Sequence, residues 1–286
     1  MNKELQNHLS LLIDQPIQNI FPVSGGDISL AYKVKTKAKT YFLKVNRSKD
    51  ALTMFQKEKR GLETIALIKT ISTPKVYACD KFKSETFLMM EYIESKRPNA
   101  EDYIRFGKAL ATLHQITAEN FGFQEDNFIG SLPQSNTKNN SWVDFYTKER
   151  LLPQLELAKL KGLLSENECP SEHIIKEKLE DLFYNVKPSL LHGDLWSGNY
   201  LISKEGIPYL IDPAVYYGHN EVDIAMSKLF GGFGDDFYKS YFSVYPNDSK
   251  TASRLEIYQL YYLLVHLNLF GKSYYSSVKN ILNKYF

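Results

Sequence analysis

The sequence predicts an α+β protein with two lobes, a small one built on an antiparallel sheet and a larger one that is mainly helical. Three observations predict this fold class. The first third of the 286 residues is dominated by short strand-like runs, the remainder has helical periodicity, and an extended segment at 91–93 joins the two parts. We therefore divide the chain into domains of residues 1–93 and 94–286.

The small lobe is expected to hold one sheet and two helices. Pro74 marks the entry to the second half of the sheet, and Gly25-Gly26 separates the first two strands. The predicted elements are a helix at 5–13, strands at 17–23, 29–35 and 41–45, a helix at 50–69, and strands at 75–78 and 86–92.

The larger lobe is expected to be helical apart from one hairpin. Its last predicted helix, 255–267, is apolar nearly all round and should therefore be buried. The expected helices are 101–116, 142–160, 171–184 and 255–267, and the hairpin strands are 200–202 and 207–211.

Composition narrows the class of function. Lys and Arg total 35 against 33 Asp and Glu, and this near balance predicts neither a nucleic-acid nor a membrane partner. The two cysteines offer no disulfide framework, and the first residues lack the apolar core of a signal peptide, so we expect a cytoplasmic location. We also expect a monomer. Any anion that this chain binds must then be held by a local site.

The residues that indicate chemistry gather around the predicted hairpin. Asn199 precedes its first strand and Asp212 follows its second, so an antiparallel pairing should make them neighbours. An amide oxygen and a carboxylate are hard ligands suited to Mg²⁺. Asp194, on the loop before them, could accept a hydroxyl proton. The pattern His-Gly-Asp-x-x-x-x-Asn followed by Asp matches phosphoryl-transfer kinases, whereas the alternative is that these residues only form Asx turns.

A kinase needs a second phosphate anchor, and Lys44 offers one. It lies between apolar residues on a predicted strand. Glu58 falls on the inward face of the following helix, where a buried carboxylate needs a partner. The pair would direct the ammonium to the α- and β-phosphates. The alternative is a solvated Glu58 at the edge of the apolar stripe.

Two further segments are candidates for nucleotide binding. Gly25 and Gly26 could form a flap whose backbone N–H groups face phosphates, although a Gly-Gly pair is also an ordinary hairpin turn. The segment 89–93, which includes Met90, Glu91, Tyr92 and Ile93, could supply backbone groups and apolar walls to adenine, or could be merely a connector.

With these residues in place, the chain resembles the fructosamine kinase (ketosamine 3-kinase) family, a branch of the aminoglycoside-phosphotransferase-like kinases. The resemblance covers nearly the whole chain. It rests most on HGDLWSGN at 192–199 and DPAVYYGHNEVD at 212–223, supported by SGGDIS at 24–29 and YFLKV at 41–45. It implies a bilobal protein-kinase-like fold and ATP-dependent phosphorylation of the 3-hydroxyl of ketosamines, free or protein-bound, which initiates protein deglycation.

The resemblance also implies roles for particular residues. Asp194 would be the catalytic base, Asn199 and Asp212 the Mg²⁺ ligands, and Lys44 with Glu58 the phosphate-anchoring pair. Trp196 is suggested as a platform for the sugar, although a core Trp beneath the loop is equally compatible with the sequence, and His219 could line the acceptor pocket. Asp223 is expected to brace the catalytic loop, and His114 and His192 to be structural.

Three other functions share parts of this pattern. An aminoglycoside- or choline-type kinase keeps the reaction but changes the acceptor. A non-catalytic nucleotide-binding scaffold would be expected to have lost Lys44, Asp194, Asn199 or Asp212, and all four are present. A metal-dependent phosphohydrolase would have no use for Lys44 and Glu58.

Overall fold

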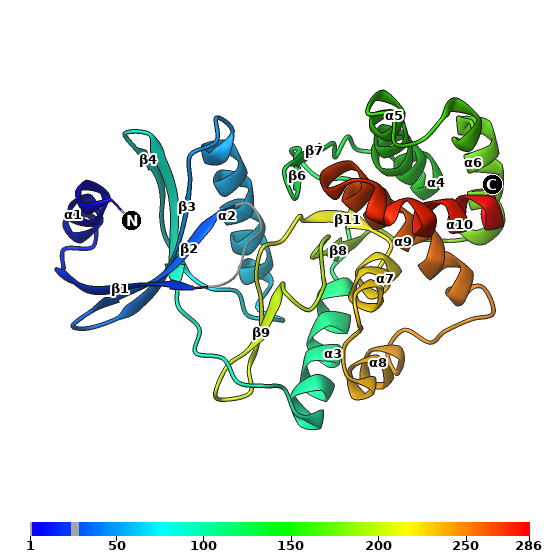
Figure 1. The fold of residues 1–286 in the computed structure, drawn as a ribbon. Coiled ribbons are helices and arrows are strands. Elements are labelled where there is room, and N and C mark those ends of the chain that lie inside the picture. The colour runs from blue at the N-terminus through cyan, green and yellow to red at the C-terminus, as the bar shows by residue number, and fades with distance from the viewer. Residues whose placement is uncertain (1, 24–28) are drawn as a thin grey trace. The chain divides into compact units, whose positions relative to one another are not determined.

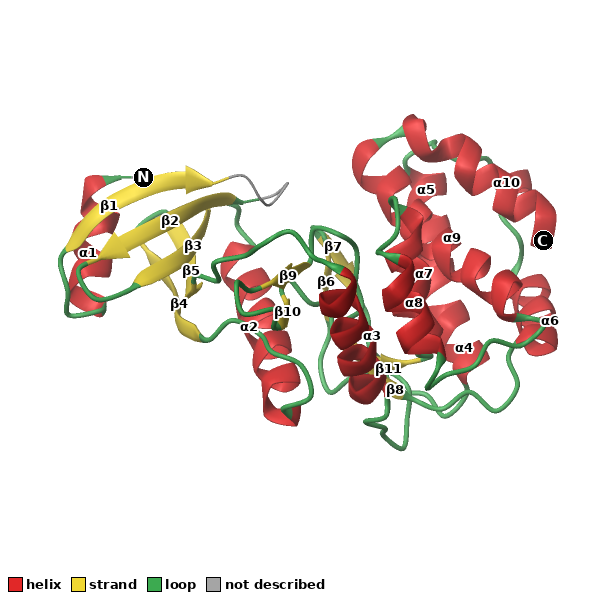
Figure 2. Ribbon diagram, turned by 90° about the horizontal axis from the view of Figure 1, so that it is seen from below, coloured by secondary structure: helices red, strands yellow, loops and turns green. Residues whose placement is uncertain are grey.

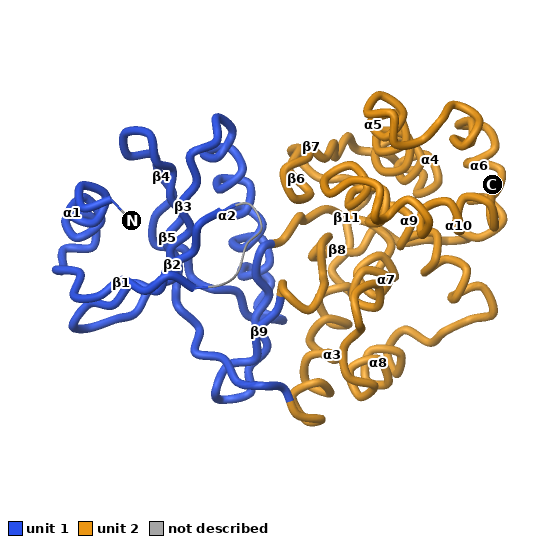
Figure 3. Tube along the Cα trace, viewed as in Figure 1, with its two compact units in different colours: residues 1–98, 200–212 blue, residues 99–199, 213–286 orange. Residues whose placement is uncertain are grey.

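The computed structural model describes residues 2–23 and 29–286, so the predicted glycine flap at Gly25 and Gly26 lies outside the described residues. The chain forms two compact units (Figure 3): residues 1–98 with 200–212, and residues 99–199 with 213–286. Thus the hairpin at 200–212 groups with the strand-rich first unit, whereas the division into domains at residue 93 stays a prediction. Within the described part of the chain, none of the helices combines the length and apolar character needed to cross a bilayer.

Unit 1 contains a five-stranded antiparallel sheet in the order β1-β2-β3-β5-β4, and a separate β9–β10 hairpin (Figure 1). The central strands carry the core of this sheet: β3 and β5 are buried along most of their length, whereas the edge strands β1 and β4 contain one buried residue between them. The elements are α1 (Lys3–Leu12), β1 (Ile17–Val23), β2 (Leu30–Thr36), β3 (Thr40–Asn46), α2 (Ala51–Ile68), β4 (Val76–Phe82), β5 (Glu85–Glu91), β9 (Tyr200–Ile202) and β10 (Pro208–Leu210).

The sheet of unit 1 lies between its two helices (Figure 1). On one face, Leu5 and Leu9 of α1 pack against strand residues that include Leu43. On the other face, Phe55 and Leu62 of α2 pack against other strand residues. Because successive side chains of a strand point to opposite faces, the position after Leu43 is directed to the α2 side.

Unit 2 is mainly helical, with two short strand pairs, β8–β11 and β6–β7 (Figure 2). Its elements are α3 (Ala100–His114), β6 (Asn127–Ile129), β7 (Leu132–Gln134), α4 (Trp142–Tyr146), a π-helical turn (Thr147–Leu151), α5 (Leu152–Leu160), a 3₁₀ turn (Glu166–Glu168), α6 (Glu172–Leu182), β8 (Ser189–Leu191), β11 (Tyr216–Gly218), α7 (Glu221–Leu229), α8 (Asp235–Phe242), α9 (Thr251–Phe270), a 3₁₀ turn (Lys272–Tyr274) and α10 (Tyr275–Tyr285).

The core of unit 2 is organised around α9, which contacts α5, α7 and α10. Most of its side chains are buried, which confirms the prediction made from its apolar surface. A second packing contact joins α3 to α8. There a Cβ on Gly107 would lie only 2.4 Å from the carbonyl oxygen of Phe237, so the glycine is what allows the two helices to approach so closely.

The structure corrects two expectations. The helix predicted at 142–160 is interrupted by the π-helical turn at Thr147–Leu151. The expectation that the hairpin near residue 200 is the sole strand pair after residue 94 was wrong, because β6–β7 and β8–β11 are also present. Each of their strands has three residues, too few to show an alternating pattern.

Candidate active site

Lys44 of β3 points toward α2 and forms the predicted pair with Glu58. Its Nζ donates to Oε1 of Glu58 at 2.8 Å, and it also bonds the carboxylate of Asp212. The side chains of Lys44 and Glu58 are only 10% and 14% exposed, which excludes the alternative of a solvated Glu58. A single ammonium in unit 1 is therefore held between two carboxylates.

The charges of this cluster depend on one another. Burial alone would lower the pKa of Lys44, but Asp212 and Glu58 outweigh it and raise that pKa above its ordinary value. Burial raises the pKa of Glu58, with Asp212 adding to the rise and Lys44 opposing it. Lys44 therefore stays charged, and two acidic groups compete for its one ammonium.

Asp212 follows the β9–β10 hairpin, where Leu210 pairs with Tyr200. Asn199 immediately precedes Tyr200, and Asp212 lies two residues after Leu210. Both proposed metal ligands are therefore close in sequence to the paired residues Tyr200 and Leu210. Asp212 has a φ of 54°, in the left-handed region that only Gly, Asn and Asp adopt readily.

The loop after β8 carries the other proposed catalytic residues and belongs to unit 2. His192 is fully buried, and its Nδ1 accepts the backbone N–H of Asp194 at 3.2 Å. Nδ2 of Asn199 donates to the carbonyl of Asp194 at 2.8 Å and to its Oδ2 at 3.1 Å. The structure thus brings Asp194 and Asn199 together, and His192 has the structural role predicted for it.

The side chain of Asp223, on α7, accepts hydrogen bonds from the backbone of this loop. Its Oδ2 accepts the backbone N–H of His192 at 2.8 Å and lies 3.1 Å from Nε2 of His114, while its Oδ1 accepts the N–H of Gly193 at 2.8 Å. Burial alone would raise the pKa of Asp223, but His114 and the Gly193 N–H lower it. The predicted roles of Asp223 and His114 are confirmed by these contacts.

Trp196 is partly buried, and its ring lies so close to Gly198 that a Cβ there would be 2.4 Å from the indole. The indole of Trp196 is thus only partly buried and packs against its own loop.

His219 lies away from this loop. It follows Gly218, which pairs with Ser189 at the end of β8–β11 farthest from the catalytic loop. The structure does not bring His219 to Asp194.

The segment predicted to contact adenine is the end of β5 and the residues that follow. Met90 is buried against α2, and the backbone N–H of Glu91 donates to the carbonyl of Lys75 at 2.8 Å. The ammonium of Lys33 lies 4.0 Å from the centre of the Tyr92 ring. The Glu91 N–H is therefore already used, and the contact of this segment with adenine stays a prediction.

Asn199 and Asp212 have the chemistry that a Mg²⁺ ion requires. Both bonds of Asn199 use its Nδ2, so no described residue donates to its amide oxygen. Asp212 contributes a carboxylate that is one-third exposed. An amide oxygen and a carboxylate suit a cation that retains waters and phosphate oxygens as further ligands.

Two buried residues that were not predicted from the sequence support the catalytic loop and the β8–β11 pair before it. Tyr262 of α9 is buried and donates its hydroxyl to the carbonyl of Gly193 at 2.8 Å. Arg150, in the π-helical turn, is fully buried and lies 4.0 Å from the centre of the Tyr216 ring. The many tyrosines of the apolar helix at 255–267 could have indicated the role of Tyr262. No local pattern in the sequence indicates that Arg150 is buried.

Comparison with known proteins agrees with this geometry. The family model described as fructosamine kinase matches residues 1–286. The "Probable ketoamine kinase" of Lactiplantibacillus plantarum is 41% identical over 271 residues, covering 94% of this chain and 95% of the relative. The chloroplastic "Protein-ribulosamine 3-kinase" of Arabidopsis thaliana is 39% identical over 277 residues, covering 94% of this chain and 83% of the relative.

Solved structures extend the likeness to three dimensions. A candidate fructosamine-3-kinase from Haemophilus somnus superposes with a TM-score of 0.88 at 29% identity, covering 99% of this chain and 96% of that one. Aminoglycoside phosphotransferase APH(4)-Ia, at 15% identity and a TM-score of 0.63, shares the fold alone. The predicted bilobal, protein-kinase-like α+β fold is confirmed.

Proposed function

The chain belongs to the fructosamine kinase family, and we propose that it transfers the γ-phosphoryl group of ATP to the 3-hydroxyl of a ketosamine. The acceptor would be the sugar part of a glycated amine, either free or on a protein. One observation carries the proposal: the ammonium of Lys44 is buried between Glu58 and Asp212. A hydrolase with the same loop would not need this cluster.

Lys44 would neutralise the α- and β-phosphates of the nucleotide. Glu58 fixes the direction of its ammonium by a 2.8 Å bond, so little reorganisation is needed when the phosphates arrive. We also propose that the backbone of the segment with Gly25 and Gly26 covers the phosphates, and that Tyr92 and Ile93 contact adenine.

Asp194 would act as the base. Its carboxylate accepts the proton of the attacking hydroxyl while that oxygen bonds to phosphorus and the β–γ bridging oxygen leaves. Asn199 holds Asp194 in place through two hydrogen bonds from one amide nitrogen. Asn199 and Asp212 would hold Mg²⁺, which supplies charge neutralisation to the transferred phosphoryl group.

The proposed product would give the protein a role in repair. Phosphate is a much better leaving group than hydroxide, so a 3-phosphorylated ketosamine is expected to eliminate phosphate and then release its amine. Released lysine side chains would be deglycated. Trp196 is proposed as the platform on which the sugar ring lies.

An assay of ATP consumption with several acceptors tests the substrate class. Ribulosyl-lysine, erythrulosyl-lysine, fructosyl-lysine and kanamycin are compared at equal concentration with MgATP. We expect turnover with one or more of the three ketosamines and none with kanamycin. Turnover of kanamycin alone would instead make the protein an aminoglycoside kinase.

A pair of variants tests the base. Asp194→Asn should abolish turnover while nucleotide binding, measured by calorimetry, stays near that of the wild type. Asp235→Asn changes an exposed carboxylate of α8 and serves as the control, for which we expect unchanged turnover. Undiminished turnover by Asp194→Asn would refute the assignment of the base.

A further inference from the structure

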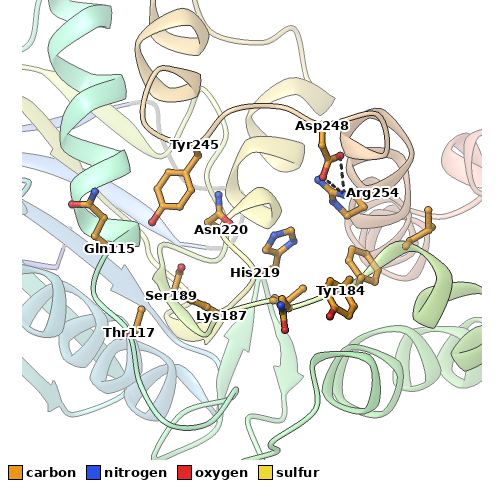
Figure 4. Close-up of a pocket in the computed structure, with 14 residues that line it drawn as sticks. Gln115, Thr117, Tyr184, Lys187, Ser189, His219, Asn220, Tyr245, Asp248 and Arg254 are labelled. Atoms are coloured by element: carbon orange, nitrogen blue, oxygen red, sulfur yellow. Dashed lines mark hydrogen bonds and ion pairs between the residues drawn. The ribbon is translucent and has the colours of Figure 1, made fainter.

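Unit 2 contains a cavity of about 420 Å³ whose lining includes none of the residues proposed above for phosphoryl transfer (Figure 4). It opens at the end of β8–β11 where Ser189 pairs with Gly218, whereas the catalytic loop leaves the other end, where Leu191 pairs with Tyr216. At a rise of about 3.3 Å per residue, the three residues from Ser189 to His192 span about 10 Å. The cavity is therefore separate from the loop that carries Asp194.

His219 presents a hydrogen-bond donor to this cavity. The Trp142 indole N–H donates to the Tyr258 hydroxyl at 2.9 Å, and Tyr258 lies 2.7 Å from Nδ1 of His219. Nδ1 is the only acceptor that the described residues offer to the Tyr258 hydroxyl proton, which places the proton of the neutral imidazole on Nε2. No described residue pairs with that Nε2–H, and the ring stands in the middle of the lining in Figure 4.

Asn220 presents an acceptor beside this donor. Its Nδ2 donates to the Tyr241 hydroxyl at 2.8 Å, and its side chain makes no cap bond to α7. No described residue donates to its amide oxygen. The cavity therefore offers an unpaired donor and an unpaired acceptor on consecutive residues, both fixed by buried tyrosines.

The charges around the cavity cancel. Arg254 is nearly buried and is already paired with Glu221 at 2.6 Å and with Asp248 at 3.0 Å, a pair drawn with dashed lines in Figure 4. The exposed ammonium of Lys187, which has no ion-pair partner among the described residues, balances the excess carboxylate. An anion would meet Asp248, and a cation would meet Arg254 and Lys187. The lining is therefore suited to a neutral ligand.

Aromatic rings supply the apolar part of the lining. Tyr184, which is 89% exposed, and Tyr245 stand on different sides of the cavity. A monosaccharide has C–H faces that pack on such rings and hydroxyl groups that both donate and accept. The volume also lies within the range of about 300–1,000 Å³ typical of small-molecule sites.

We propose that this cavity is a second site, one that binds a neutral polyhydroxylated ligand of monosaccharide size. The hydroxyls of the ligand would accept from His219 Nε2–H and donate to Asn220 Oδ1, with a sugar face against Tyr184. This site is independent of the proposed kinase reaction, and its test uses binding rather than turnover.

The chain contains two tryptophans, one near each site, and their indole resonances separate the two. Trp142 is linked to His219 through Tyr258, and Trp196 belongs to the catalytic loop. The ¹⁵N-labelled full-length protein is titrated without nucleotide with methyl β-D-glucoside, a non-reducing sugar that cannot glycate lysines. A Trp196→Phe variant assigns the remaining resonance to Trp142.

We expect a saturable shift of the Trp142 resonance, with a Kd on the order of millimolar, and no such shift with sodium phosphate or acetate. A shift confined to Trp196 would mean that the sugar binds only at the catalytic loop, and a Trp142 shift with the anions alone would indicate an anion site. Either result, or no shift with any probe, would overturn the proposal.

Variants identify the residues responsible. Tyr184→Ala and His219→Gln should each weaken glucoside binding by tenfold or more. Leu160→Ala, which removes another highly exposed side chain of unit 2, should leave it unchanged. Tyr184 is on the surface, so its variant keeps the test valid even if His219→Gln disturbs folding. Unaltered binding by Tyr184→Ala would contradict the proposed contact with the sugar face.

Discussion

The carboxylate of Asp223 accepts the backbone N–H of Gly193 at 2.8 Å, which fixes the catalytic loop to the first turn of α7. The same carboxylate also accepts the N–H of His192 and contacts His114. His114 in turn lies 2.7 Å from the Tyr241 hydroxyl. One buried acid thus connects the loop before Asp194 to α3, α7 and α8.

Replacing this acid should destabilise the protein. Asp223→Asn presents an NH₂ group to one of the donors, leaving buried polar groups unpaired, and we expect the free energy of unfolding to fall by about 3 kcal/mol. Urea unfolding measures this fall in stability.

The stabilisation by Asp223 should also depend on pH. Since folding lowers the pKa of Asp223, the stabilisation is present above about pH 4 and is lost as pH falls through the folded-state pKa. A variant with wild-type stability at pH 7 would contradict this role.

Gly193 should not tolerate a side chain. Its φ is +85°, and a Cβ would lie 2.1 Å from the carbonyl oxygen of Ala214. Gly231 has a similar φ of +90° but no atom within 4 Å of its Cβ position. Gly231→Ala should cost only the backbone strain of about 1–2 kcal/mol, whereas Gly193→Ala should cost more and abolish turnover. Equal thermal stabilities for the two variants would show that the contact with Ala214 is not limiting.

Lys44 and Glu58 should differ in their effects on catalysis. Lys44→Met removes the charge that the proposed mechanism uses, so we expect turnover with ATP to fall by about 100-fold. Glu58→Gln leaves the bond from Lys44 to Asp212 and should reduce turnover by about tenfold. Steady-state kinetics at varied MgATP measure both. A larger loss of turnover in Glu58→Gln than in Lys44→Met would show that Glu58 does more than orient Lys44.

His219 should make stability depend on pH. Burial, assisted by Arg254, lowers its pKa to about 3, and its side chain is only 13% exposed. Below pH 6.5 the unfolded state binds a proton that the folded state does not, so stability falls as pH falls. At about 1.4 kcal/mol per pH unit, the loss is about 2 kcal/mol between pH 6.5 and 5. His219→Gln should remove this part of the dependence in urea unfolding, and identical pH profiles would refute it.

The sequence by itself determined the elements and the cluster in unit 1. Strand alternation directs Lys44 away from the face of Leu43, and helical periodicity places Glu58 on the inward side of α2. Both patterns involve residues that are close together along the chain, so they can be recognised in a single sequence. The same holds for the hairpin between Asn199 and Asp212, whose register follows from one short turn.

The resemblance implied that Asp223 braces the catalytic loop, but tertiary structure alone decided which side chains surround that carboxylate and where the second cavity lies. Asp223 meets His114 across 109 positions of sequence, and Arg254 meets Glu221 across 33. The resemblance implies that His219 lines the acceptor pocket, which stays a prediction; the structure shows only that His219 follows the end of β11 where Gly218 pairs with Ser189. Contacts of this kind depend on how helices and strands pack, and no periodicity of the chain records that packing.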